Sequence, residues 1–354
     1  MSILKTLIKP TMSENNNLRL FYGSCLALIT TAFSYSIRAG ILPQLGAEYG
    51  ISAEDLGFIN TMWFLGFPIT MVIGGIFYNS IGPKRIMMFA FVAHTLGILL
   101  TIFATNYSTL LVSTLFIGLG NGCTEAACNP LIATSYSGKR MNTLLNRFHM
   151  WFPGGILVGS LISFFMTANM ASVGWRGQMW ILMIPTIAYA FTFWGQKFPE
   201  TGAEVVKQRS GNAQIGSWIW MLIFVCICMS LTAISEFGPG QWANIVLSSS
   251  GAEPMLILAL TAGVAAVGRY FGGDFVHRFD QTGVLLVSAI VTTIGIVLLS
   301  MVTGPVAYLA AIIFGMGYCY FWPNMIGFTA EKIPASGALG MSIVGAMGMF
   351  STAI

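Results

Sequence analysis

The stretch TLFIGLGNGCTEAACNPLIATSYSGKRMNTLLNRFHMWFPGGILVG, Thr114–Gly159, decides the fold. It predicts two apolar helices joined by a short basic turn at residues 138–140, and each helix is long enough to cross a bilayer. The first helix nevertheless carries Glu125, and the second carries His149. A carboxylate in hydrocarbon costs about 2.5–3.5 kcal/mol, so such a group usually faces a cavity and marks a path for solutes or protons.

Helical spacing gathers the polar residues of this stretch on two faces. Asn121, Glu125 and Asn129 follow one another at i, i+4 and i+8 and share one face, and Asn146 and His149 form a stripe on the returning helix. Counted from the turn at 1.5 Å per residue, Glu125 lies roughly 20 Å deep and His149 roughly 14 Å deep. We therefore expect the two side chains to share one cavity. The alternative is a polar stripe that only holds the two helices together.

Composition indicates a membrane protein. Of its 354 residues 56% are hydrophobic and 8% are charged, and the mean hydropathy is +0.78. Soluble domains carry about 25% charged residues. This is therefore an all-α polytopic membrane protein, with the lipid bilayer as its surroundings. The six cysteines stand in apolar stretches without metal-ligand spacing, and we expect them to pack as small apolar side chains.

Apolar stretches of about 20 residues recur along the chain and predict eleven spans. They are Leu20–Leu42, Leu56–Tyr78, Ile86–Thr105, Leu110–Ala133, Leu145–Met166, Met179–Trp194, Ser217–Ile245, Leu256–Phe275, Val284–Met301, Ala307–Phe328 and Ala338–Ile354.

Lys and Arg orient these spans. Every Lys and Arg except Arg38 and Arg176 lies in the amino-terminal tail or in a loop on the same side of the membrane as this tail. Arg269 and Arg278 are counted here with the loop after the eighth span. The positive-inside rule then predicts a cytosolic amino terminus. The net charge of +4 is explained by this placement and does not indicate nucleic-acid binding.

An internal repeat divides the spans into two sets. The pair Gly74–Gly75 recurs as Gly272–Gly273, 198 positions later, and the positions of Arg38 and Glu236 are related by the same offset. Gly118-x-Gly120 recurs 197 positions later as Gly315-x-Gly317. The longest polar break lies between the two sets. We therefore expect an amino-terminal six-helix bundle at residues 1–195, a cytosolic linker at 196–216 and a carboxy-terminal bundle at 217–354.

Two motifs resemble the major facilitator superfamily. The segment GGIFYNSIGPKR, Gly74–Arg85, is similar to the signature loop between its second and third helices. It matches at four positions and has Asn where the signature has Asp, so the loop residues are Gly75, Asn79, Gly82, Lys84 and Arg85. The segments GLGNGCTEAACNPLIA, Gly118–Ala133, and NRFHMWFPGG, Asn146–Gly155, resemble the fucose permease-like sugar:proton symporters.

The resemblance implies the major facilitator fold, in which two six-helix halves are parallel repeats. In the fucose permease group an Asp of the first helix shares the proton work, whereas residues 35–43 of this chain contain Arg38 and no Asp. At the repeat offset Ile354 corresponds to a position inside span five. We therefore expect the chain to be a piece of a twelve-helix protein, truncated in its eleventh helix and lacking about 40 residues.

Aromatic and amide side chains near the midplane suit a sugar-like solute, because sugar rings stack on aromatic faces and their hydroxyls need polar partners. We expect the solute to be bound by Asn121, Asn129, Asn146, Trp151, Gln241, Trp242, Tyr318, Trp322 and Asn324. The alternative is that the aromatic residues belong to interface belts. The sequence GPGQW at Gly238–Trp242 predicts a break in the seventh span that lines the cavity, or else an ordinary kink.

Two charges of opposite sign lie at similar depth in the first and seventh spans, which the resemblance makes neighbours across the cavity. We expect Arg38 and Glu236 to pair as a gate when the outer side closes. The alternative is that each is solvated separately or binds the solute.

These features predict a secondary transporter that moves a sugar or similar polar solute by alternating access, in symport with protons carried by Glu125 and tuned by His149. The alternatives are a transporter of organic anions such as sugar acids, a drug or metabolite exporter of the same fold, and a membrane receptor or scaffold without transport activity. No enzyme, metal or cofactor motif occurs in the sequence. We expect a monomer in a bacterial inner membrane, with a small solute and protons as its partners.

Overall fold

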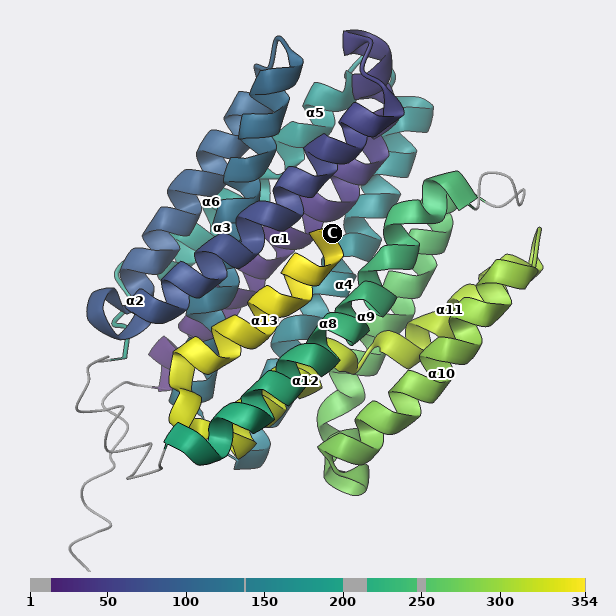
Figure 1. Ribbon diagram of the computed structural model, residues 1–354. Coiled ribbons are helices and arrows are strands. Elements are labelled where there is room, and N and C mark those ends of the chain that lie inside the picture. Colours follow the sequence, from purple (N-terminus) through teal and green to yellow (C-terminus); the bar gives the residue numbers. More distant parts are fainter. Residues whose placement is uncertain (1–13, 137, 200–214, 247–252, 354) are drawn as a thin grey trace, which may run out of the picture.

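Each expected apolar span coincides with a helix or with a pair of helices (Figure 1). The computed structural model describes residues 14–136, 138–199, 215–246 and 253–353, without the side chains of residues 215–217, 240–246 and 273–279. Within these ranges the regular elements are helices, and no strand occurs. The expected all-α membrane fold is confirmed.

The described part of the first half contains six helices. They are α1 (Glu14–Tyr49), α2 (Ala53–Ile102), α3 (Tyr107–Ser135), α4 (Gly138–Asn169), α5 (Gly174–Ile181) and α6 (Met183–Phe193). Helix α2 has 50 residues, about 75 Å at 1.5 Å per residue, which is more than twice the thickness of a bilayer core. It contains two of the expected spans, because the chain turns back at Gly82, where φ is 77°. Glycine adopts this angle without strain.

The second half contains α8 (Ile215–Val246), α9 (Pro254–Phe279), α10 (Gln281–Met301), α11 (Val306–Tyr318), α12 (Phe321–Lys332), the short 3-10 helix η2 (Pro334–Ser336) and α13 (Gly337–Ala353). Helix α8 continues through Pro239, so the expected break at residues 238–242 is wrong. The break lies instead in the tenth span, between α11 and α12 at Cys319 and Tyr320. Irregular backbone at this depth is tolerated where it is buried in protein or lines a cavity.

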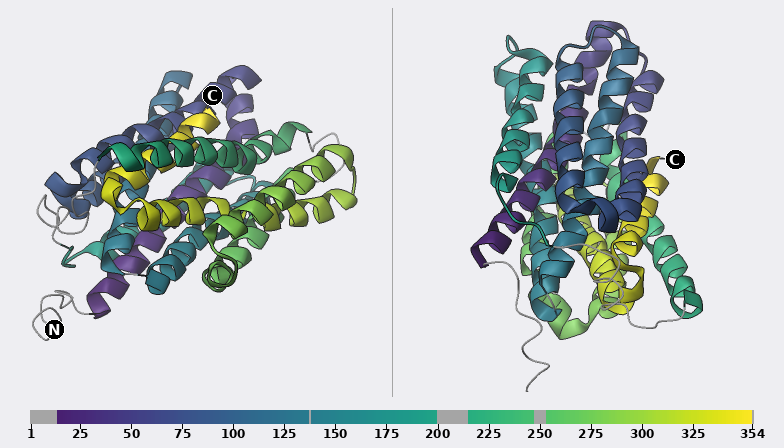
Figure 2. Two further views of the ribbon diagram at one scale, coloured as in Figure 1. Left: turned by 60° about the horizontal axis from the view of Figure 1, so that its bottom comes forward. Right: turned by 90° about the vertical axis from the view of Figure 1, so that its left-hand side faces the viewer.

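The two halves meet along two pairs of helices. Helix α4 packs along α9, and α13 packs along α2. At the repeat offset the fifth span (α4) corresponds to the eleventh (α13), and the second span (in α2) corresponds to the eighth (α9). The two contacts are therefore related by the internal repeat. At the second one a Cβ on Gly75 would lie 2.6 Å from the Cβ of Ser342, so α2 and α13 approach this closely because Gly75 has no side chain. Figure 2 shows the first half (purple to teal) beside the second half (green to yellow) in two further views.

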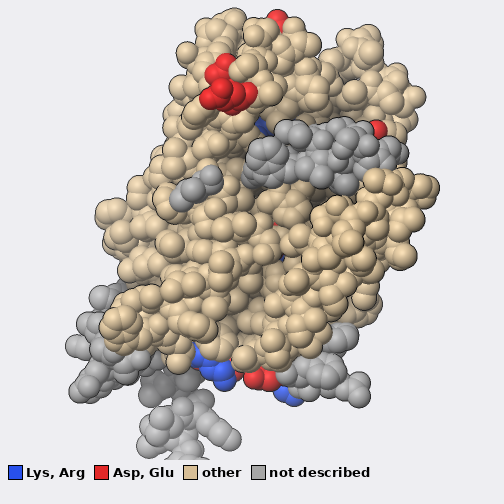
Figure 3. All heavy atoms as spheres, turned by 45° about the vertical axis from the view of Figure 1, so that its right-hand side comes forward, with Lys and Arg blue, Asp and Glu red and all other residues tan. Residues whose placement is uncertain are grey.

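The face drawn in Figure 3 carries its exposed charges near its two ends. On the face drawn in Figure 3 the Lys and Arg side chains gather at the lower end, which we call the basic end, and the broad middle is almost uncharged. Large apolar side chains such as Phe191, Trp220, Phe224 and Leu231 are exposed along the helices. An apolar exterior with a polar interior is the pattern of a protein surrounded by lipid. The chain is therefore an integral membrane protein.

Candidate functional site

Glu125, Asn129 and His149 form one hydrogen-bonded group in the middle of the first half. Asn129 lies one helical turn after Glu125 on α3 and donates its amide N–H to Glu125 Oε2. His149 of α4 has its Nε2 at 2.9 Å from Asn129 Oδ1 and its Nδ1 at 3.9 Å from Glu125 Oε1. All three side chains are buried. The expected proximity of Glu125 and His149 is present.

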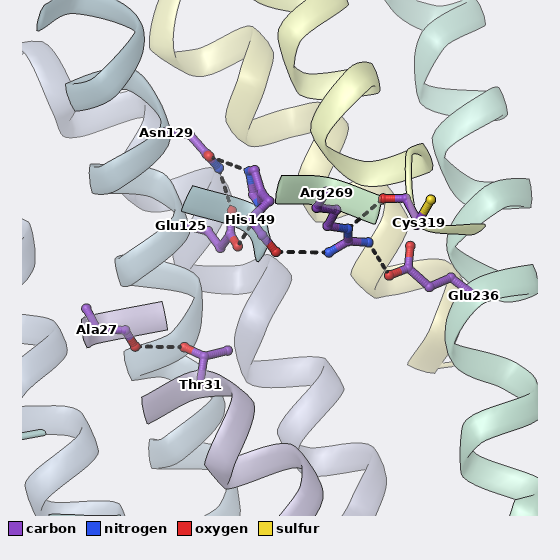
Figure 4. Close-up of polar contacts among 8 residues, drawn as sticks. All are labelled: Ala27, Thr31, Glu125, Asn129, His149, Glu236, Arg269 and Cys319. Atoms are coloured by element: carbon purple, nitrogen blue, oxygen red, sulfur yellow. Dashed lines mark hydrogen bonds and ion pairs between the residues drawn. The ribbon is translucent and has the colours of Figure 1, made fainter. Parts of the chain in front are cut away.

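Arg269 brings a positive charge to this group from the second half (Figure 4). It lies on α9 with only 1% of its surface exposed, and its Nη2 pairs with Glu236 Oε1 of α8 at 2.7 Å. Its Nη1 donates to the backbone carbonyl of His149 at 3.1 Å. One guanidinium therefore joins a carboxylate of the second half to the backbone beside the first half's histidine.

The break between α11 and α12 supplies the third ligand of this guanidinium. Arg269 Nε donates to the carbonyl oxygen of Cys319 at 2.6 Å. A carbonyl at the end of a helix has no partner within the helix, so it is free to accept from a side chain. The irregular backbone in the tenth span thus helps to hold a charge in a place where water is scarce.

Two small adjoining cavities touch this group. One, of about 10 Å³, is lined by Glu125, His149, Glu236, Arg269 and Trp322, among others. The other, of about 30 Å³, extends past Glu236 to Tyr35 of α1 and Tyr318 of α11. We call them together the central cavity. A space of this size has room for a water molecule and not for a sugar, so the site is closed in this structure.

Aromatic rings account for the closure. Phe237 of α8 lies 4% exposed and has ring centroids of both halves around it, at distances of 5.9–6.5 Å. Its neighbours are Tyr35, Phe64, Phe152 and Trp322. These five rings, which we call the aromatic cluster, fill the space between the halves beside the central cavity.

The halves also meet at the basic end. Glu331 at the end of α12 accepts hydrogen bonds from Asn142 of α4 at 3.2 Å and from Gln281 of α10 at 3.3 Å. Together with the close contact between Gly75 and Ser342, this joins the halves on the side of the basic residues. The two halves are thus in contact both at the middle and at this end.

Not all residues expected to bind the solute face the central cavity. Trp322 and Tyr318 line it, and Asn129 lies beside it in contact with Glu125. Asn146 is buried one turn nearer the basic end, and Asn324 is buried on α12 without lining either cavity. The side chains of Gln241 and Trp242 lie outside the described residues.

Two further residues of the expected binding set, Asn121 and Trp151, lie away from the central cavity. The amide of Asn121 is engaged inside the first half, with its oxygen at 2.9 Å from His94 Nε2 and its nitrogen at 3.3 Å from Ser34 Oγ. Trp151 is 37% exposed on the outside of α4. It follows His149 by two residues, about 200° around the helix, so the two side chains point to opposite sides.

The expected pair of Arg38 and Glu236 is not formed in this structure. Glu236 pairs with Arg269, as described above. Arg38 of α1 donates its Nη1 to Asn60 Oδ1 and lies over the ring of Trp63, 5.6 Å from its centroid. Its Nε has no hydrogen-bond partner within the described part of the chain. The gate role of Arg38 and Glu236 stays a prediction.

The residues of the signature loop lie at the turn inside α2. Gly82 provides the turn, and Lys84 and Arg85 are exposed after it. Gly75 permits the contact with α13, and Asn79 lies partly buried between these features.

The sequence reasoning missed Arg269 and Phe237. Arg269 was assigned to the basic side together with Arg278, although it stands six residues before the end of its own apolar span, Leu256–Phe275. That position was the available signal, because a charge inside a span usually faces a protein interior. Phe237 carried no signal, since one Phe in an apolar helix resembles any other. Within the described ranges no three His, Cys, Asp or Glu side chains are placed to hold a metal ion.

Comparison with known proteins adds a family and several relatives. Residues 24–354 match the Major Facilitator Superfamily. The sialic acid transporter NanX of Escherichia coli (strain K12) is 25% identical over 271 residues, which cover 73% of this chain and 63% of NanX. The probable chloroplastic anion transporter 1 of Oryza sativa subsp. japonica is 24% identical over 285 residues, which cover 73% of this chain and 53% of that protein. The chain spans about half to two thirds of the length of the first curated relatives that it matches.

Solved structures share the fold at lower identity. The crystal structure of the transporter FucP in the outward conformation superposes with a TM-score of 0.76 at 16% identity, covering 95% of this chain and 90% of FucP. The proton:xylose symporter XylE superposes with a TM-score of 0.78 at 14% identity, covering 96% of this chain and 87% of XylE. The resemblance to the fucose permease group is confirmed at the level of the fold.

Proposed function

The chain belongs to the major facilitator superfamily, and from this premise we propose that it moves a sugar or a similar polar solute across a membrane in symport with protons. The observation that carries the proposal is the buried group of Glu125, Asn129 and His149 beside Arg269. An ionisable group at this depth is expensive and is retained where it handles a proton or a charged ligand. NanX and XylE are named for acidic and neutral sugars respectively, which supports a sugar-like solute for this chain.

Glu125 is the proton carrier in this proposal. Its carboxylate is stable at this depth while the Asn129 N–H and the positive charge of Arg269 face it, and a carboxyl group takes up a proton where such compensation is weakened. His149 tunes the exchange, because its Nδ1 lies 3.9 Å from Glu125 and its Nε2 contacts Asn129. Arg269 contacts the His149 carbonyl from the other half, so a movement of the halves changes the charge environment of Glu125.

Binding of the solute requires the halves to separate at the aromatic cluster. Once Phe237 and its neighbours part, Trp322 and Tyr318 offer stacking faces, and Glu236 Oε2 offers an acceptor that has no hydrogen-bond partner in the described part of the chain. Closure around the solute from the other side completes one cycle of alternating access. In this proposal residues 1–195 and 217–354 move as the two bodies, with 196–216 as their linker.

Orientation follows from the basic end. Lys84 and Arg85 follow the turn inside α2, Lys139 stands at the start of α4 and Lys332 at the end of α12. We therefore place the basic end and the amino terminus on the cytosolic side of a bacterial inner membrane.

Uptake into proteoliposomes tests the proposal. Glu125→Gln should abolish accumulation of the solute driven by a pH gradient and leave exchange of labelled for unlabelled solute intact, because the amide cannot carry the proton. Glu48→Gln is the matched control, since Glu48 pairs with Arg176 at the far end of α1 from the basic end. A Glu125→Gln variant that still concentrates the solute with the gradient would show that Glu125 is not the carrier.

Transport of an organic anion is the second candidate, and one observation favours it. The guanidinium of Arg38 is buried on the wall of α1, next to the aromatic cluster, and its Nε has no partner among the described residues. A carboxylate of a sugar acid is a suitable partner for it. Competition decides between the candidates: N-acetylneuraminate or D-galacturonate should block uptake for an anion transporter, and L-fucose or D-xylose should block uptake for a neutral sugar transporter. Arg38→Gln should weaken competition by the acids only.

A further inference from the structure

A second buried polar chain crosses the first half, away from the central cavity. His94, in the returning leg of α2, is fully buried and has its Nδ1 at 3.1 Å from the hydroxyl of Tyr189 on α6. Its Nε2 lies 2.9 Å from Asn121 Oδ1 on α3. Asn121 Nδ2 then donates to Ser34 Oγ of α1 at 3.3 Å, and the indole N–H of Trp63 donates to the same oxygen at 2.8 Å. Four helices are joined in this way.

The donor and acceptor atoms assign a hydrogen to each hydrogen bond of this polar chain. An amide oxygen only accepts, so His94 Nε2 carries the hydrogen and donates to Asn121. The Nδ1 of the neutral ring is then an acceptor, and the Tyr189 hydroxyl donates to it. Ser34 accepts twice and passes its own hydrogen to the carbonyl of Thr31 at 2.7 Å. No member of the chain has to be charged.

The local sequence leaves space for the histidine. A Cβ on Gly120 would lie 2.3 Å from Cδ2 of the His94 ring, so the ring rests directly on the backbone of α3. In the sequence the glycine pattern at residues 118–120 indicated only the internal repeat. In the structure its second glycine, Gly120, leaves the space that the His94 ring occupies.

Trp63 connects this buried chain with the wall of the candidate site. Its ring lies 5.6 Å from that of Tyr35 and 4.7 Å from that of Phe64, and both of these belong to the aromatic cluster. The guanidinium of Arg38 stands over the same indole ring. The orientation of Trp63 thus sets the surface on which Arg38 and Tyr35 are held.

We propose that His94 is a positioning residue, which fixes Trp63 through Asn121 and Ser34 and thereby presets the Arg38 wall of the solute site. The effect on transport rests on the proposed function, whereas the link from His94 to Trp63 does not. A residue that supports a site from behind is expected to act on the affinity for the solute more than on the coupling to protons.

The link is tested by the nitrogen–proton signals of the tryptophan indoles in the detergent-solubilised chain, with the Trp63 signal assigned through Trp63→Phe. His94→Leu should shift the Trp63 signal, because the support of Asn121 is lost. His94→Gln should restore it, because a glutamine amide N–H is able to donate to Asn121 in place of Nε2. The Trp175 indole, which donates to Glu48 at 2.6 Å, is the internal control and should not move. An unmoved Trp63 signal in His94→Leu would overturn the proposal.

Ser34→Ala covers the case in which His94→Leu does not fold. It removes the acceptor of the Trp63 N–H directly and should shift the same signal and spare Trp175. If the Trp63 signal does not respond to the loss of Ser34, the proposed link from Ser34 to Trp63 is wrong.

Uptake measurements give the functional arm. With the solute found in the competition assay, His94→Leu should raise KM about 2- to 12-fold, the equivalent of one neutral hydrogen bond, and leave the dependence on the pH gradient unchanged. His94→Gln should lie near the parent, and His94→Leu combined with Trp63→Phe should be no worse than Trp63→Phe alone. An equal KM in His94→Leu and the parent would contradict the functional arm. If no probe is taken up at all, the proposed function fails, and the indole signals still decide on the link.

Discussion

The two halves share a helical arrangement but hold their interiors together by different means. In the first half polar side chains bond between helices, as with His94 and Tyr189, or Trp63 and Ser34. The positions 198 residues after His94, Trp63 and Ser34 are all threonines. Each of their hydroxyls returns to a carbonyl of its own helix, namely Thr292 to Ser288, Thr261 to Ile257 and Thr232 to Met229.

The second half instead concentrates its strong polar contacts on Arg269. The repeat places Met71 at the position that Arg269 occupies, so this charge has no counterpart in the first half. A large apolar cavity of about 780 Å³ also lies between α9, α10 and α11, with Cys319 in its wall. The comparison teaches that a repeat preserves backbone packing, whereas the polar contacts are free to diverge. The first half is stabilised by hydrogen bonds between its helices, and the second half contains the buried ion pair of Arg269 and Glu236.

Removing the charge of the second half should have the largest effect. Arg269→Met gives this position the residue that the first half has, and it leaves Glu236 buried without a partner. We expect a loss of about 3–5 kcal/mol in the free energy of unfolding in detergent, measured by denaturant titration. Glu236→Leu combined with Arg269→Met should recover much of this loss, because the uncompensated charge is gone. Lys332→Met is the control at a half-exposed pair, with an expected loss below about 1 kcal/mol.

If Arg269→Met is as stable as the parent, the ion pair of Arg269 and Glu236 does not stabilise the second half. The contrast between the two halves would then be wrong.

Breaking the polar chain of the first half should have an intermediate effect. Asn121→Leu leaves the His94 N–H without an acceptor, and we expect a loss of about 1–3 kcal/mol in the same titration. Because Asn121 reaches the site only through Ser34 and Trp63 in this proposal, Asn121→Leu should raise KM for uptake about as much as His94→Leu does. A much larger rise would mean that Asn121 contacts the solute, as the sequence suggested.

The smallest effect is expected at the matching position of the second half. Thr292→Val removes a hydroxyl whose hydrogen bond, within the described ranges, goes to the Ser288 carbonyl of its own helix, and it keeps the shape of the side chain. The change in the free energy of unfolding should stay within about 0.5 kcal/mol. A loss as large as that of Asn121→Leu would show that the second half depends on interhelical contacts at this position as well.

Hydrophobicity along the chain was sufficient to determine the class and the positions of the spans, and short motifs indicated the superfamily. These features depend on stretches of about 20 residues, and their signal is contained in each stretch. The proximity of Glu125 and His149 was also predictable, because both lie on helices joined by a short turn and their depths are counted from the same point. The bend at Gly82 was indicated by the signature loop.

Only the tertiary structure decided which face of each helix meets which neighbour. Asn121 and Glu125 lie on one helical face in the sequence pattern, yet one is engaged with His94 and Ser34 and the other borders the central cavity. Arg269 was placed at the membrane surface by its charge, and a carbonyl freed at Cys319 together with Glu236 holds it in the middle of the bundle. These outcomes depend on helices that are distant in the sequence. A buried charge is stable only when partners from several such helices converge on it, and no local pattern records that convergence.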